Sequence, residues 1–168
     1  MVRTNFIRSA ARVVHASLAA LLLTSVHHVY GAYVYGTPWR AHVAYVSVVA
    51  AAVLAGSFVV LRRRAGTVAG AIALSILTVV TLAIPVVGIG LFEGGYNHAL
   101  KNAVYFAGGS LPTMRRLFPP PAYEIPNDVF FEVTGVLQLF LGAAAGRRLY
   151  QLLAARRGGE ESASAGTA

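Results

Sequence analysis

The chain contains no cysteine, one lysine and six acidic residues among 168. The absence of cysteine excludes disulfide bonds, thiolate metal sites and cysteine nucleophiles, which leaves histidine, carboxylate, carbonyl and water as metal ligands. The GxxxxGK[ST] phosphate loop, the GxSxG nucleophile elbow and the HExxH zinc motif are also missing. These absences exclude the familiar nucleotide-binding, serine hydrolase and zincin signatures.

Apolar residues, by contrast, are abundant. They make up 57% of the chain, and the mean hydropathy is +0.64. A soluble domain of this size does not carry so much apolar surface, whereas several membrane spans account for it. The composition therefore predicts an all-α integral membrane protein.

Four apolar segments are long enough to cross a bilayer, which takes about 20 helical residues. We predict spans over residues 10–30, 42–61, 66–90 and 129–149. The basic start and leucine run of the first resemble a signal peptide, but His27 and His28 stand where a small-residue cleavage site would be, which favours a retained span. Residues 1–157 are thus expected to form one membrane domain, and the small, polar residues 158–168 a disordered cytoplasmic tail.

Positive charge is concentrated beside the spans. The net charge of +8 could indicate nucleic acid binding, but no basic run is interleaved with aromatic residues on a soluble element, so we exclude that partner and expect the lipid bilayer. If the spans alternate, arginines 3, 8, 12, 62, 63, 64, 147, 148, 156 and 157 share one side, against Arg40, Lys101, Arg115 and Arg116 on the other. This bias predicts a multi-pass protein of the cell membrane with both termini in the cytoplasm.

The connection between the third and fourth spans, residues 91–127, is predicted to form an extracytoplasmic cap. Pro85 and the glycines at 88, 90, 94 and 95 predict that the third helix kinks or breaks there. Prolines 119–121 predict a stiff, extended segment, and Asn127 or Asp128 an N-cap for the fourth span. The predicted fold is a four-transmembrane-helix bundle with this cap.

Glycines four residues apart predict close helix contacts within the membrane. Two such pairs occur, Gly66 with Gly70 and Gly142 with Gly146. Packing inside the bundle is the simpler interpretation, and a homo-oligomer formed through either face is the alternative.

Most of the ionisable residues that could carry chemistry lie at the outer ends of the spans. Four of the six acidic residues fall between residues 93 and 132, together with His98 and the lysine. Carboxylates next to the hydrocarbon layer pair, bind an ion or face a polar cavity. We therefore predict a polar pocket that binds a metal ion or a small apolar ligand, with candidate ligands His28, Glu93, His98 and Glu132 and supporting candidates Tyr30, His42, Asn97, Lys101 and Asp128. Nitrogen and oxygen ligands of this kind suit zinc, iron, manganese or copper.

A structural network is the competing interpretation. In it Lys101 neutralises Glu93, and Glu132 bonds to His28, Tyr30 or Asn97. The protein would then be a non-catalytic accessory or assembly subunit, or an oligomeric small-solute transporter. His27 and His42 are expected to be interfacial histidines. The sequence leaves open whether the protein is an enzyme.

Overall fold

The computed structural model describes residues 2–120 and 124–165, which contain helices and no strand. Four helical stretches are long and apolar enough to cross a membrane: Thr4–Val34, Pro38–Arg64, Val68–Phe106 and Val129–Arg156. These findings confirm the prediction of an all-helical chain with four helices able to cross a membrane. The elements in chain order are α1 (Val2–Val34), the short 3-10 helix η1 (Pro38–Ala41), α2 (His42–Arg64), α3 (Val68–Thr81), the π-type helix η2 (Leu82–Leu100), α4 (Lys101–Phe106), α5 (Leu111–Leu117) and α6 (Val129–Ala165).

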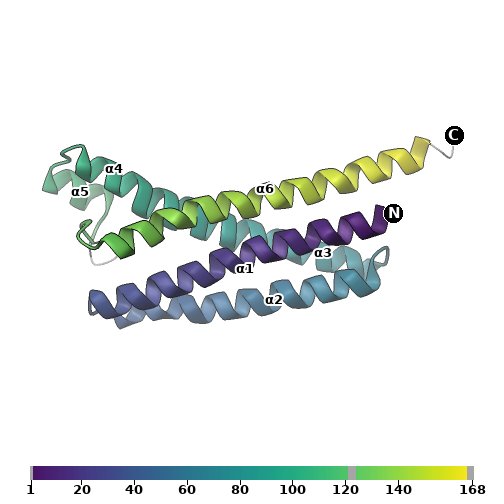
Figure 1. Cartoon of the computed structure of the whole chain (residues 1–168), viewed down its shortest axis with the longest axis horizontal. Helices are drawn as coiled ribbons and strands as arrows, with labels where there is room; N and C mark the ends of the chain where they lie inside the picture. The colour runs from purple at the N-terminus through teal and green to yellow at the C-terminus, as the bar shows by residue number, and fades with distance from the viewer. Residues whose placement is uncertain (1, 121–123, 166–168) are drawn as a thin grey trace.

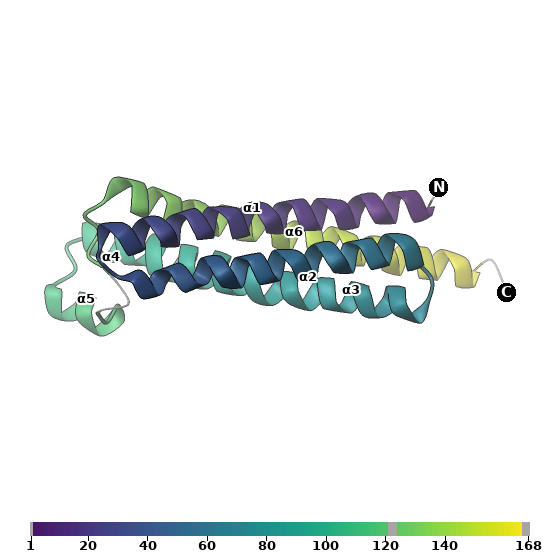
Figure 2. The ribbon, with the colours of Figure 1, turned by 90° about the horizontal axis from the view of Figure 1, so that it is seen from below.

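Helices α1, α2 and α6 lie side by side, and the stretch from α3 to α4 crosses α6 at an angle (Figures 1 and 2). Helix α1 packs against α2 and α6, α2 packs against α3, and α6 packs against η2. The start of α1 and the end of α6 lie at the same end of the bundle, and α4 and α5 lie at the other. This arrangement fits an even number of spans, and which end faces the cytoplasm stays a prediction.

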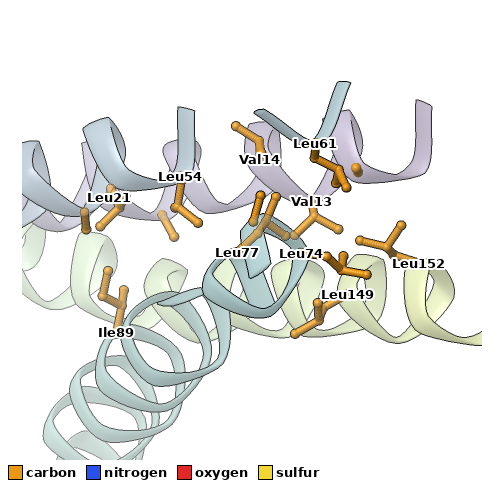
Figure 3. Close-up of a cluster of buried hydrophobic side chains, with 14 residues drawn as sticks. Val13, Val14, Leu21, Leu54, Leu61, Leu74, Leu77, Ile89, Leu149 and Leu152 are labelled. Carbon is orange, nitrogen blue, oxygen red and sulfur yellow. The ribbon is translucent and has the colours of Figure 1, made fainter. Parts of the chain in front are cut away.

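The inner face of α1 explains how the bundle is held together. Small or polar side chains recur every three or four residues, and their exposure is at most 1%: Ala10, Val13, Ser17, Ala20, Thr24 and His27. Small residues at this spacing let helices approach closely in a bilayer. They border a core of leucine, isoleucine and valine drawn from α1, α2, α3, η2 and α6 (Figure 3).

The outer surface of the bundle is apolar. Large side chains such as Leu22 at 68%, Val48 at 69% and Phe140 at 63% are exposed. Water would penalise so many exposed apolar groups, whereas lipid tails would not. The distribution therefore agrees with a protein that spans a membrane.

The predicted break at the end of the third span is wrong, and a kink there stays a prediction. The helix continues from Val68 to Phe106, and over η2 its backbone adopts the wider π-type geometry with hydrogen bonds five residues apart. Pro85 lies inside this stretch, and the glycines serve packing, because Gly90 lies against Gly142 of α6. In Figure 1 the helix runs obliquely across α6, so a helix longer than the hydrocarbon thickness can be accommodated by tilt.

The predicted cap is therefore only partly separate from the bundle. Residues 91–106 belong to the third long helix, and the remainder contains the short helix α5. Residues 121–123, including part of the proline run, lie outside the described residues. Asp128 caps α6 as predicted, since its Oδ1 accepts a hydrogen bond from the Phe131 N–H at 2.7 Å. Helix α6 continues to Ala165, into the segment 158–168, for which disorder stays a prediction.

The predicted glycine pairs have roles within the chain. Gly66 has a φ of +83° in the turn between α2 and α3, and Gly70 lies against the backbone of Arg64. Gly142 lies against Gly90, while Gly146 leaves ordinary room beside Val86. The homo-oligomer stays a prediction.

Candidate metal centre

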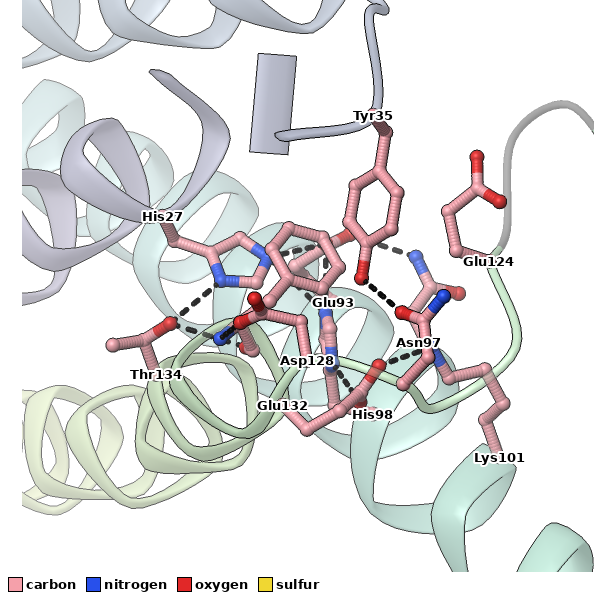
Figure 4. A network of polar contacts seen from close by, with 12 residues as sticks. His27, Tyr35, Glu93, Asn97, His98, Lys101, Glu124, Asp128, Glu132 and Thr134 are labelled. Carbon is pink, nitrogen blue, oxygen red and sulfur yellow. Dashed lines mark hydrogen bonds and ion pairs between the residues drawn. The ribbon is translucent and has the colours of Figure 1, made fainter. Parts of the chain in front are cut away.

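Three side chains from two helices converge within a network of polar contacts (Figure 4). They lie toward the end of the bundle where α4 begins, opposite the start of α1 (Figure 1). His27 comes from α1, and Glu93 and His98 come from η2. The two Nε2 atoms are 3.1 Å apart, and Glu93 Oε1 lies 3.5 Å from His27 Nε2 and 3.4 Å from His98 Nε2. Each residue thus presents one possible metal-ligand atom to a common point. Such a group of three could hold a metal ion.

The π-type geometry brings Glu93 and His98 together. Five residues apart, they would point in different directions on an α-helix, where residues three and four apart share a face. In the π-type helix the hydrogen bonds join residues five apart, and each turn is wider. Residues five apart therefore lie on nearly the same face of the helix. Short π segments in other proteins are frequent at functional sites. The pair therefore meets along one continuous helix.

The tautomer of His27 follows from its partner on α6. His27 Nδ1 lies 3.0 Å from Thr134 Oγ1. The Thr134 hydroxyl donates its one hydrogen to the backbone carbonyl of Phe130, at 2.7 Å, or of Phe131, at 3.1 Å. Its oxygen is therefore the acceptor, and His27 carries its proton on Nδ1. The Nε2 atom is left with a lone pair.

Glu132 and Lys101 determine the orientation of His98. His98 Nδ1 lies 2.7 Å from Glu132 Oε2, and Lys101 Nζ donates to Glu132 Oε1 at 2.9 Å. A carboxylate only accepts, so His98 Nδ1 carries a proton and neutral His98 also has its lone pair on Nε2. A carboxylate behind a histidine is the usual partner of a metal-bound imidazole. The predicted pairing of Lys101 with Glu93 is wrong, because Lys101 pairs with Glu132.

The other oxygen of Glu93 is held by its own helix. Asn97 Nδ2, four residues along the chain, donates to Glu93 Oε2 at 2.7 Å. Oε1 is therefore left to face the histidines. His28 Nε2 lies 3.7 Å from the same Oε1, and among the described residues its Nδ1 has no hydrogen-bond partner. His28 contacts the three-residue group at this carboxylate.

Helix α6 closes the centre on one side. The Phe131 ring stacks on His27 with centroids 4.1 Å apart. Gly135 leaves room for the His98 imidazole, because a Cβ at this position would collide with the ring. Tyr35, which follows α1, donates a hydrogen bond to Asn127 at 2.8 Å. Burial raises the pKa of Tyr35 to about 12, so its hydroxyl stays neutral and remains a donor.

Only some of the residues predicted for the site lie in the converging group; others support it or lie elsewhere. Glu93 and His98 belong to the converging group, while Glu132, Asn97 and Lys101 hold its members. Tyr30 donates to Asp128 at 3.0 Å, which ties the end of α1 to the start of α6. His42 is exposed and donates to the backbone carbonyl of Trp39, away from the group. The predicted bonds from Glu132 to His28, Tyr30 or Asn97 are replaced by its bonds to His98 and Lys101.

The sequence prediction missed two residues of this centre, His27 and Thr134. His27 was expected at the interface, but its exposure is 0%. The spacing of Ser17, Ala20 and Thr24 carried the signal, since it continues to position 27 and not to position 28. Thr134 lies two residues after Glu132, and its role depends on how α6 is rotated against α1.

Comparisons of the chain with protein-family models, with curated proteins and with solved structures find no match. The chemistry of the converging side chains is therefore what supports a function.

Proposed function

We propose that this membrane-spanning helical protein binds one divalent metal ion through His27 Nε2, His98 Nε2 and Glu93 Oε1. The observation that carries the proposal is the orientation of these three atoms. With both imidazoles neutral, two Nε2 lone pairs and a carboxylate oxygen face one another across 3.1–3.5 Å. Three converging acceptors repel one another, and either a bound cation or a proton on one Nε2 atom, which makes the 3.1 Å contact a hydrogen bond, removes the repulsion.

The separations suit a zinc-sized ion. Zinc bonds to nitrogen and oxygen are about 2.0–2.1 Å, so the ligand atoms of a tetrahedral site lie about 3.3–3.4 Å apart. The three observed separations, 3.1, 3.4 and 3.5 Å, bracket this value. Zinc is therefore our first expectation. Iron, manganese and copper use the same ligand types and are the other candidates.

Two histidines and one carboxylate leave a position for water or a substrate atom. Structural zinc sites are closed by four protein ligands, whereas catalytic sites keep such an open position. The proposed role is thus that of a Lewis acid near the outer face of the membrane, with Glu132, Thr134 and Asn97 holding the ligands in place. The orientation with both termini in the cytoplasm, which places this centre at the extracytoplasmic side, is part of the proposal.

Elemental analysis of protein purified in mild detergent without chelator tests the proposal. We expect close to one metal ion per chain in the parent, and loss of metal in His27→Gln and Glu93→Gln. Glu132→Gln is expected to weaken metal binding about ten- to a hundredfold, because Glu132 holds His98 without belonging to the three-atom group. His42→Gln, at an exposed histidine, is the matched control and should retain the metal.

A well-folded parent that holds no metal, even after reloading, would contradict the metal centre. The second candidate function, an accessory or assembly subunit or an oligomeric small-solute transporter, would then be favoured. Its supporting observation is the buried ion pair of Lys101 and Glu132 at 2.9 Å, where both residues are at most 8% exposed. In that case Glu132→Gln would destabilise the fold, since it leaves the lysine buried and unpaired.

A further inference from the structure

The end of the bundle that holds the start of α1 carries the net charge of the protein. At the opposite end four basic residues are matched by four carboxylates: Arg40, Lys101, Arg115 and Arg116, with Glu93, Glu124, Asp128 and Glu132. The remaining ten basic residues are arginines, and the two remaining acidic residues are Glu160 and Glu161 of α6. The formal charge of +8 therefore belongs to the end that holds these arginines.

Three helices bring arginines to one level of this end. One buried residue from each of α1, α2 and α6 belongs to the same apolar cluster (Figure 3): Val13, Leu61 and Leu149. An exposed arginine is the neighbour of each in the sequence: Arg12, Arg62 and Arg148. Together with further exposed arginines of the same helices they form what we call the arginine cluster: Arg8, Arg12, Arg62, Arg63, Arg64, Arg147 and Arg148.

The carboxylate side chains that the structure describes do not neutralise the arginine cluster. They lie at the opposite end, where Glu124 pairs with Arg40 at 3.3 Å and Glu132 pairs with Lys101 at 2.9 Å. Within the cluster, Arg148 donates a hydrogen bond to the neutral side chain of Gln151 at 3.1 Å. Charges of one sign on neighbouring helices produce a positive potential, which attracts anions.

Apolar side chains adjoin the arginine cluster on the outer surface of α2 and α3. Val60, Val68 and Ile72 are exposed by 39%, 78% and 56%. A soluble anion would contact the guanidinium groups alone. A phospholipid would contact the guanidinium groups with its head group and these apolar side chains with its acyl chains. The surface therefore fits a phospholipid better than a soluble phosphate or a nucleic acid.

We propose that the arginine cluster binds the head group of an anionic phospholipid, whose acyl chains lie along Val60, Val68 and Ile72. A guanidinium group can donate two parallel N–H bonds to phosphate oxygens, and it stays charged at physiological pH. Zwitterionic lipids also carry a phosphate, but their cationic group offsets its charge. The cluster should therefore select lipids by net charge. This lipid site is separate from the metal centre and does not depend on it.

Lipid selectivity of the full chain in phosphatidylcholine vesicles tests the inference. Spin-labelled phosphatidylglycerol or spin-labelled phosphatidylcholine is added, and electron paramagnetic resonance measures the fraction of each lipid whose chain motion the protein restricts. We expect phosphatidylglycerol to associate at least about fivefold more strongly than phosphatidylcholine, the contribution of one arginine at an anionic surface. Salt at about 1 M should reduce this ratio, because it shortens the screening length to about 3 Å.

Variants at the two ends distinguish the arginine cluster from positive charge in general. Arg62→Gln, Arg63→Gln and Arg64→Gln combined should lower the ratio at least about threefold. Replacing the same three arginines by lysine keeps the charge and should retain most of the selectivity. Arg115→Gln with Arg116→Gln, at the opposite end, should leave the ratio unchanged. All five side chains are exposed, so these changes spare the core, and circular dichroism of the helical content checks the fold.

Equal association of the two lipids with the parent, or an unchanged ratio in the glutamine variant of α2, would overturn the inference. Inorganic phosphate and a short oligonucleotide, present on both sides of the membrane, test for soluble partners. At matched ionic strength, neither should displace phosphatidylglycerol more than chloride does. Stronger displacement by either would assign the arginine cluster to a soluble anion and overturn the lipid site.

Discussion

Hydrogen bonds to the far side of each imidazole determine what the two histidines present to the centre. His27 donates from Nδ1 to Thr134, and His98 donates from Nδ1 to Glu132. The Nε2 lone pairs therefore face the same point as the Glu93 carboxylate. At the scale of single residues, metal affinity depends on these outer partners as well as on the ligands.

Thr134→Val should weaken metal binding about ten- to a hundredfold. Valine has nearly the shape of threonine but cannot accept the His27 Nδ1 hydrogen, so the ring loses the bond that keeps its lone pair on Nε2. Zinc titration against a competing chelator measures the change. Thr134→Ser retains the hydroxyl and should bind zinc like the parent; equal affinity in all three proteins would contradict this role of Thr134.

Gly135→Ala should displace the His98 imidazole, because the added Cβ would collide with its ring. We expect loss of bound metal by elemental analysis. Gly146→Ala, on the same helix, adds a Cβ in ordinary contact with Val86 and should keep the metal. Retention of metal by both variants would show that the ring has room to move.

At the scale of elements, the π-type geometry of η2 has two consequences. It places Glu93 and His98 on one face, and it directs Gly90 and Gly94 toward α6. The close approach of the two helices at these glycines brings Thr134 and Glu132 to the histidines. Packing and site formation therefore depend on the same stretch of backbone.

Two adjacent glycines of η2 allow a direct test of this packing. Gly94→Ala would push η2 away from the α6 backbone at Leu139, whereas Gly95→Ala makes only ordinary contacts. We expect Gly94→Ala to destabilise the protein by about 1–3 kcal/mol and to lose metal. Gly95→Ala should be neutral or slightly stabilising, since alanine favours helix. Reversible unfolding in detergent measures both, and equal stability of the variants would contradict the proposed contact.

At the scale of the whole molecule, many large apolar side chains face outward, while small and polar side chains are buried together with the leucine-rich core. The start of α1 and the end of α6 lie at one end of the bundle (Figure 1), and the histidine and carboxylate group lies toward the other, where α4 begins. If the arginine-rich end faces the cytoplasm, the centre opens toward the outer side of the membrane.

Cysteine labelling tests this orientation, and the chain has no native cysteine to interfere. Ser110→Cys, before α5, should react with a membrane-impermeant maleimide on intact cells. Ala65→Cys, in the turn between α2 and α3, should react only after the membrane is permeabilised. The reverse pattern would overturn the orientation and place the centre at the cytoplasmic face.

The sequence by itself determined the class of protein, the four spans and an N-cap at Asn127 or Asp128, of which the structure selects Asp128. These features depend on local composition: about 20 apolar residues suffice to cross a bilayer, and a carboxylate at a helix start can accept a free backbone N–H. The sequence also indicated the importance of Glu93, His98, Glu132 and Lys101, since ionisable residues next to apolar helices are costly and therefore informative.

Only the tertiary structure decided how these groups pair. Choosing His27 over His28 requires knowing the rotation of α1, and choosing Glu132 as the partner of Lys101 requires knowing how α6 crosses η2. The wider turn of η2 could not be predicted, because proline and several glycines usually end a helix. In this chain close packing against α6 keeps the helix continuous, and that packing forms only when the two helices meet.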